Sequence, residues 1–193
     1  MAANGASADF NTSAVPVGTW YCDKSHSNVM WETPYKALGS LLTGRFNYFV
    51  LKNLNFDEGV PANISFEGYV RLNTVNTGEP GRDGGCLLTT YGTNSTNTSE
   101  PANIATLKSK PGTGRYSTTD ASFLAEADFT FLGITKEVTV KMNYYAKTDI
   151  GTAYMSGVYG EFEINALADL LPGNTNIGDK VKIRIDNLIR NKK

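Results

Sequence analysis

The chain has 193 residues and a formal net charge of −1. This length suits one domain with a core of its own, and the near balance of charge excludes a strong field that would attract nucleic acid or an anionic membrane surface. No apolar run approaches the roughly 18 residues of a membrane-spanning helix.

Two cysteines, Cys22 and Cys86, leave open a disulfide between them or two separate buried thiols, and we favour the thiols. No CxxC motif or Cys/His cluster is present, so neither a metal nor another cofactor is expected. Residues 1–17 are small, polar and turn-rich, as in a flexible spacer that follows a removed export signal. The sequence therefore predicts one domain over residues 18–193.

Most of that domain alternates apolar and polar side chains with a period of two, the pattern of strands with one dry and one wet face. In chain order the expected strands are Thr19–Cys22, Asn28–Glu32, Thr43–Phe56, Ala62–Asn73, Ile104–Lys108, Phe123–Leu132, Glu137–Lys147, Thr152–Asn165 and Lys180–Ile189. Tyr35–Leu42 and Gly85–Tyr91 are expected to hold a helical turn or two. Val75–Gly85 is a glycine-rich turn, and Gly92–Gly114 is typical of a long surface loop.

The clearest pattern surrounds the stretch FTFLGITKEVTVKMNYY, residues 129–145. It predicts a hairpin that breaks at Gly133-Ile134-Thr135. The expected dry face carries Ala125, Ala127, Phe129 and Phe131 before the break, and Val138, Val140, Met142 and Tyr144 after it.

About eight alternating strands with short connections indicate an all-β, antiparallel domain, either a sandwich or a barrel. Several strands are longer than the usual five or six residues, which favours an eight-stranded, closed and tilted barrel, because closure removes exposed edges. The interior of such a barrel is just wide enough for its own side chains or for one small ligand.

Catalytic motifs are scarce. The single histidine, His26, shares one turn with Asp23, Ser25 and Ser27, but a Ser/His/Asp triad normally collects its members from separate elements. A structural role where the first strand bends is favoured, and an enzyme using His26 is the least favoured alternative. No phosphate-binding, dinucleotide-binding or zinc-protease motif occurs.

Five motifs in order, from about Gly18 to Ile189, resemble the YceI-like polyisoprenoid-binding family. They are WYCDKSHSNVMWET, LTGRFNYFVLKNLNFD, ISFEGYVRLNTVNTGEPGRD, FTFLGITKEVTVKM and IGDKVKIRIDNLI. The resemblance implies a lipocalin-like barrel, usually exported to the bacterial periplasm, that holds a long isoprenoid chain. The positions that fit the family pattern are Asp23, His26, Ser27, Gly44, Phe46, Thr77, Arg82, Asp83, Gly133, Thr135 and Lys136, mostly as corner and turn formers.

Two departures from the family pattern affect the expected barrel mouth. Asn165 is followed by Ala166 where the family often has an Asn-Arg pair, and Gly92–Gly114 is unusually long and polar. The identity of the ligand therefore stays open.

The function expected from the resemblance is non-enzymatic binding, transport or storage of a long apolar lipid, of the polyprenyl or quinone type. The alternative is a structural barrel filled by its own side chains; a homodimer is left open. Small residues among the aromatic ones are expected to leave a channel. Its candidate lining residues are Phe46, Phe49, Phe66, Gly68, Ala125, Ala127, Phe129, Phe131, Val140, Met142, Tyr144, Val158 and Phe162, and the candidate head-group cations are Arg45, Arg82 and Lys136.

Overall fold

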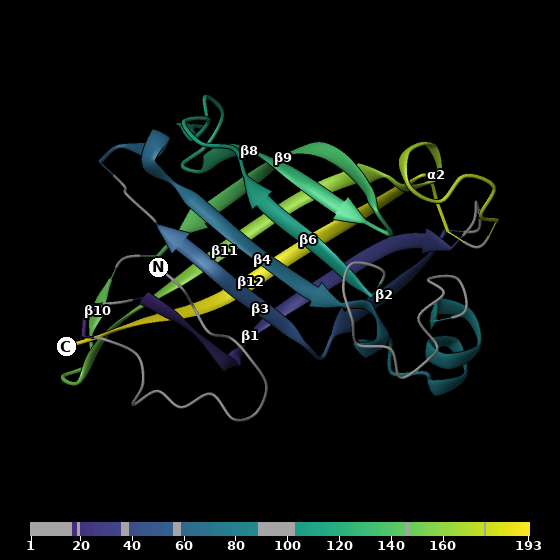
Figure 1. The fold of residues 1–193 in the computed structure, drawn as a ribbon, viewed down its shortest axis with the longest axis horizontal. Helices are drawn as coiled ribbons and strands as arrows, with labels where there is room; N and C mark the ends of the chain where they lie inside the picture. The colour runs from purple at the N-terminus through teal and green to yellow at the C-terminus, as the bar shows by residue number, and fades with distance from the viewer. Residues whose placement is uncertain are drawn as a thin grey trace.

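Twelve strands form one antiparallel sheet that curls into a half-barrel, with a few short helices at its ends (Figure 1). The computed structural model describes residues 17–18, 20–35, 39–55, 59–88, 103–145, 147–175 and 177–193. The all-β, antiparallel fold expected from the alternation is therefore confirmed, with more strands than the eight expected.

The strands are β1 (Trp20–Tyr35), β2 (Ser40–Phe46), β3 (Phe49–Asn55), β4 (Ser65–Arg71), β5 (Val75–Asn76), β6 (Ile104–Ser109), β7 (Arg115–Tyr116), β8 (Phe123–Phe131), β9 (Ile134–Tyr144), β10 (Thr148–Asp149), β11 (Ala153–Asn165) and β12 (Lys180–Lys192). The short helices are η2 (Pro61–Asn63), η3 (Leu72–Thr74), η4 (Arg82–Leu88) and α2 (Ala166–Asp169).

The strand order is β3-β4-β6-β8-β9-β11-β12-β1-β2-β5, with β7 beside β8 and β10 beside β11. The two ends of this order meet at the β2–β3 corner, where the Asn47 and Tyr48 backbone N–H groups donate to the carbonyl (2.9 Å) and the hydroxyl (3.1 Å) of Thr74. Among the described residues no strand ladder joins β1 to β3. The closed ring of strands expected from the sequence is thus replaced by a sheet that meets itself at a corner.

The first two expected strands are one bent strand, β1. Its pairing with β12 shifts register between Asp23 and Asn28, so the backbone of β1 bulges over the intervening residues. For Thr43–Phe56 the expectation of one long strand was wrong, because this segment forms two strands. It divides into β2 and β3 at Asn47–Tyr48, because these two residues turn the chain from one end of the sheet to the other.

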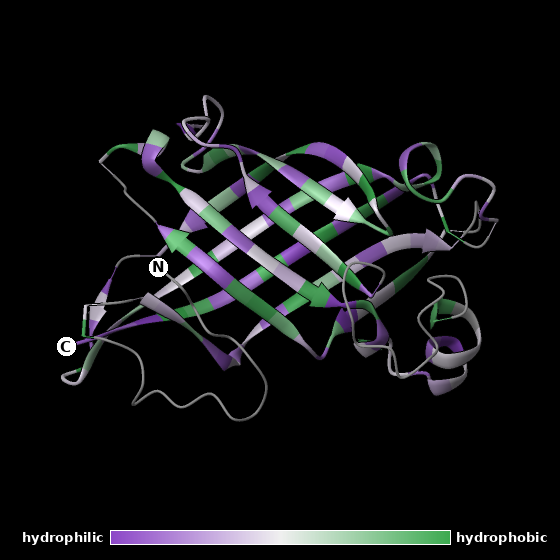
Figure 2. Ribbon diagram, in the orientation of Figure 1, coloured by the Kyte–Doolittle hydropathy of each residue, from purple (hydrophilic) through white to green (hydrophobic). Residues whose placement is uncertain are grey.

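The expected hairpin is confirmed as β8 and β9. A two-residue turn joins the strands, with positive φ at Leu132 (49°) and Gly133 (79°), the conformation that matches the twist of a hairpin. Ile134 therefore begins β9 instead of forming part of the break. Figure 2 shows the alternation of apolar and polar residues along the long strands.

Other expectations had mixed outcomes. The helical turn expected over Gly85–Tyr91 is found as η4 up to Leu88, and the rest of that range lies outside the described residues. Tyr35 and Ser40–Leu42 are strand residues, so no helical turn forms in the described part of Tyr35–Leu42. Within Gly92–Gly114, residues 92–102 lie outside the described residues, whereas Ile104–Ser109 form β6.

Candidate functional site

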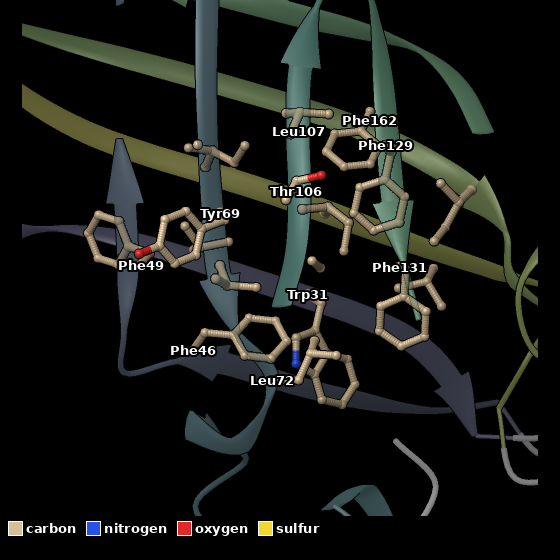
Figure 3. A pocket seen from close by; sticks show the side chains of 18 of the residues that line it. Trp31, Phe46, Phe49, Tyr69, Leu72, Thr106, Leu107, Phe129, Phe131 and Phe162 are labelled. Atoms are coloured by element: carbon tan, nitrogen blue, oxygen red, sulfur yellow. The ribbon is translucent and has the colours of Figure 1, made fainter. Parts of the chain in front are cut away.

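An apolar cavity of about 670 Å³ occupies the interior of the curled sheet. Figure 3 shows the aromatic and aliphatic side chains that surround it, with the rings of Phe129 and Phe162 side by side, 5.3 Å between centroids. This volume lies within the usual range for the binding pockets of small organic molecules.

Many strands contribute to the cavity wall, because each strand of the curled sheet turns one face inward. The strand residues that line it with apolar side chains are Val29, Trp31, Leu42, Phe46, Phe49, Val50, Leu51, Leu54, Phe66, Val70, Ala105, Leu107, Phe129, Phe131, Val140, Met142, Val158, Phe162, Ile164, Val181, Ile183 and Ile185. Val181, Ile183 and Ile185 are only partly buried although they lie on this inner wall, as expected for side chains that border open space.

Two glycines widen the cavity for different reasons. A Cβ on Gly68 would lie 2.7 Å from the Val50 carbonyl oxygen, because the neighbouring strand is bulged between Leu51 and Asn53. A Cβ on Gly160 would make only ordinary contacts, the nearest 3.6 Å from Val140. Gly68 is therefore required by the backbone, whereas Gly160 leaves room that a side chain could take.

The cavity extends to the α2 end of the barrel, which we refer to as its mouth. Its lining residues outside the strands belong to the helices and loops of this end: Leu72, Arg82, Leu87, Ala166, Leu170, Leu171, Asn174 and Ile177. Asp83 holds the loop beside Arg82, since its carboxylate accepts bonds from the Thr77 N–H (3.0 Å) and hydroxyl (2.6 Å). The Thr77-Gly78 turn and the Arg82-Asp83 pair, which fit the family pattern, thus shape the mouth.

Ten of the thirteen lining residues expected from the sequence do line the cavity. The exceptions are Ala125, Ala127 and Tyr144. Both alanines are fully buried (0% exposed) and pair with Val140 and Val138 on β9. They fill space within the packed wall instead of leaving a gap, so the expected channel beside Ala127 is wrong.

Of the three candidate head-group cations, only Arg82 reaches the cavity. Lys136 forms an ion pair with Asp169 of α2, 3.1 Å between Nζ and Oδ1. Arg45 is exposed on β2 and absent from the cavity wall.

Several lining residues were not expected from the sequence. Trp31 is the largest of them, and its indole lies flat over Gly44 on β2, where a Cβ would come within 2.5 Å of the ring. Ile183 and Ile185 were also missed, although the alternation of their segment places them on the dry face.

The Asp23–Ser27 corner lacks the geometry of a nucleophile–base pair. His26 Nδ1 lies 3.1 Å from the Asp23 carboxylate, but Ser27 Oγ donates to the Asp23 carbonyl (2.7 Å) and accepts from the Leu188 N–H (2.9 Å). The serine therefore holds the bulge of β1 against β12. These contacts support the structural role that the sequence favoured for this corner.

Cys22 is a free, buried thiol at this corner, and the side chain of Cys86 lies outside the described residues. Burial raises the pKa of Cys22 to about 11, against its ordinary value of 9.0. The described residues contain no group of three side chains arranged to bind a metal. Among them, no helix has the length and apolar character needed to cross a membrane.

Residues 20–187 match the profile of the YceI-like domain. The chain belongs to the YceI-like family. A comparison with curated protein sequences finds no match.

Solved structures of several bacterial proteins share the fold of this YceI-like chain. BcnA of Burkholderia cenocepacia has 16% identity and a TM-score of 0.63 over 87% of this chain and 98% of BcnA. A Campylobacter jejuni YceI protein has 15% identity and a TM-score of 0.60, over 80% and 87% of the two chains. A polyisoprenoid-binding domain from Saccharophagus degradans has 16% identity and a TM-score of 0.59, over 92% and 100%.

Proposed function

We propose that this YceI-like protein binds a long apolar lipid of the isoprenoid type in its cavity and acts as a non-enzymatic carrier or store. The observation that carries the proposal is the 670 Å³ cavity and its apolar wall. The polyisoprenoid-binding domain among the structural neighbours supports the same class of ligand. A barrel filled by its own side chains would leave no space of this size, so the structural alternative is disfavoured.

The free energy of transfer favours such a ligand. Each buried CH₂ group contributes about 0.8 kcal/mol, so a dozen contribute on the order of 10 kcal/mol before the cost of ordering the chain. This supports micromolar binding without a specific hydrogen bond. Selectivity should then depend mainly on the length and thickness of the chain.

Among the described lining residues, Arg82 is the cation that a polar head group could meet. Arg82 is partly buried in the cavity lining, and Asn174 lies in the same rim. We infer that the apolar chain enters from the α2 end and that its polar terminus stays beside these two side chains.

Organic extraction of the undenatured protein, purified from its native host, tests the proposal. Mass spectrometry of the extract should show an isoprenoid-type lipid near one equivalent per chain. An extract without lipid, together with failure of the protein to take up a fluorescent prenyl chain, would contradict it.

A plugging variant tests the location of the ligand. Gly160→Phe adds a ring where a Cβ has only ordinary contacts, so it should lower lipid uptake at least several-fold while the protein still folds. Gly160→Ala is the matched control and should bind nearly as the parent does. Unchanged uptake by a folded Gly160→Phe protein would place the lipid elsewhere.

Export to the bacterial periplasm and a homodimer stay predictions. Fractionation of the native host tests the first, and size-exclusion chromatography with light scattering tests the second.

A further inference from the structure

Two cations share one aromatic ring at the β2–β3 corner. Lys24 Nζ lies 4.7 Å, and the guanidinium carbon of Arg71 lies 4.0 Å, from the centroid of the Tyr48 ring. The Arg71 N–H donates to the Tyr48 carbonyl (3.1 Å), which fixes the spacing of the two residues. We call Lys24, Tyr48 and Arg71 the Tyr48 cluster.

The Tyr48 cluster differs from the other tyrosine rings that carry cations in the described part of the chain, because each of those rings has an acid beside it. Glu67 pairs with Lys52 at Tyr69, and Glu161 bonds to the hydroxyl of Tyr159 under Arg184. Tyr154 also carries two cations, Lys147 and Lys193, but there Asp149 pairs with Lys193. Within the described ranges, neither Lys24 nor Arg71 has a carboxylate within 4.0 Å. The positive charge of the cluster is therefore left without a counterion from those residues.

The environment of Lys24 makes this charge costly. The side chain is partly buried. Burial lowers the pKa of the Lys24 ammonium, and the nearby Arg71 guanidinium lowers it further. An anion bound near both cations would offset their mutual repulsion and replace the hydration that Lys24 has lost.

The Tyr48 cluster also adjoins the wall of the cavity. Lys24 Nζ lies 5.5 Å from the ring centroid of Phe49, which lines the cavity. This is the region where β1 and β3 have no described ladder between them. A group bound at the cluster is thus only one side chain away from the lipid cavity.

We propose that the Tyr48 cluster binds a phosphate group. A phosphate carries up to two negative charges and several acceptor oxygens, which match two cations held at one ring, and the guanidinium fork of Arg71 suits its geometry. The site does not require the cavity to be filled, so it goes beyond the proposed function. The phosphate belongs either to a soluble phosphate ester or to a lipid head group.

Two titrations of the lipid-stripped full chain test the phosphate site. Inorganic diphosphate, followed by calorimetry, probes the soluble source. Phosphatidylcholine vesicles with and without phosphatidylglycerol, followed by co-sedimentation, probe the lipid source. Lys24→Gln and Arg71→Gln should each weaken binding by about 10- to 100-fold, the usual effect of losing a charged hydrogen-bond partner.

Arg184→Gln is the matched control, because Arg184 also lies over a tyrosine ring but has an acid nearby. It should bind as the parent does. Diphosphate binding that both cluster variants lose supports a soluble phosphate, and binding confined to phosphatidylglycerol vesicles supports a lipid phosphate. No binding of either probe, or equal binding by folded variants, would overturn the proposal. Uptake of an uncharged prenyl chain, measured in parallel, reports separately on the cavity.

Discussion

At the scale of single residues, the Asp23–Ser27 corner shows how a trio that suggests catalysis serves a structural purpose. The Asp23 carboxylate accepts from Arg190 on β12, 2.6 Å between the charged atoms, as well as from His26. Ser27 is 5% exposed and joins the bulge of β1 to the β12 backbone. Buried backbone groups need partners, so the corner depends on the serine more than on the histidine.

Ser27→Ala should lower the free energy of unfolding by about 1–3 kcal/mol, because the Leu188 N–H would lose its acceptor. His26→Ala is the control: the imidazole side chain is 63% exposed, and Arg190 remains beside Asp23. Its effect should stay within about 0.5 kcal/mol. Urea denaturation of both variants measures the difference, and equal losses would contradict the assignment.

The raised pKa of Cys22 predicts a dependence of stability on pH. The folded protein holds the thiol proton more tightly than the unfolded chain does, since the folded pKa is about 11 and the ordinary value is 9.0. This contribution is fully present below about pH 9 and is lost as the pH rises toward 11. Urea unfolding between pH 8 and 11 should show a steeper decline for the parent than for Cys22→Ala. Parallel declines would exclude this role.

At the scale of elements, the contact between β1 and β2 depends on a missing side chain. Trp31 is 6% exposed, and its indole occupies the space where Gly44 would carry a Cβ. The glycine therefore sets how closely the two strands hold the ring against the cavity.

Gly44→Ala should destabilise the protein by about 1–3 kcal/mol, the usual cost of overpacking, because the indole must move. The change should also alter tryptophan fluorescence. Gly160→Ala, with ordinary contacts around its new methyl group, should change the free energy of unfolding much less. A Gly44→Ala protein as stable as the parent would show that the ring can shift freely.

Elements with a strict alternation were predictable from sequence, and those that bend were not. The β8–β9 hairpin was expected because its inner face is apolar at every second residue. The division of Thr43–Phe56 into β2 and β3 was missed, since Asn47 and Tyr48 continue the alternation and contain no glycine or proline. Their turn is stabilised by Thr74, which is distant in sequence.

At the scale of the whole molecule, the inner face was predictable but the location of the empty space was not. Alternation identifies which residues point inward. Whether an inward alanine borders a void depends on partners such as Val138 and Val140, which only the register of the sheet reveals. The aromatic candidates Phe129 and Phe162 therefore proved to line the cavity, whereas Ala125 and Ala127 did not.

A ligand that binds only the folded state must stabilise it. Adding a prenyl lipid to stripped protein at 100 times its dissociation constant should raise the free energy of unfolding by about 2.7 kcal/mol. The midpoint of thermal unfolding should rise with lipid concentration in the parent and much less in Gly160→Phe. A midpoint that is insensitive to lipid would argue against binding in the cavity.

The outer margin of β3 has a consequence for how the protein behaves in a crowded solution. β3 ends the strand order, so within the described residues no strand ladder runs along that margin. The bulge between Leu51 and Asn53 interrupts the regular spacing of the β3 backbone, and Lys52 places a charge there. Both features discourage strand-by-strand polymerisation, so the protein should tolerate high concentrations without forming fibrils.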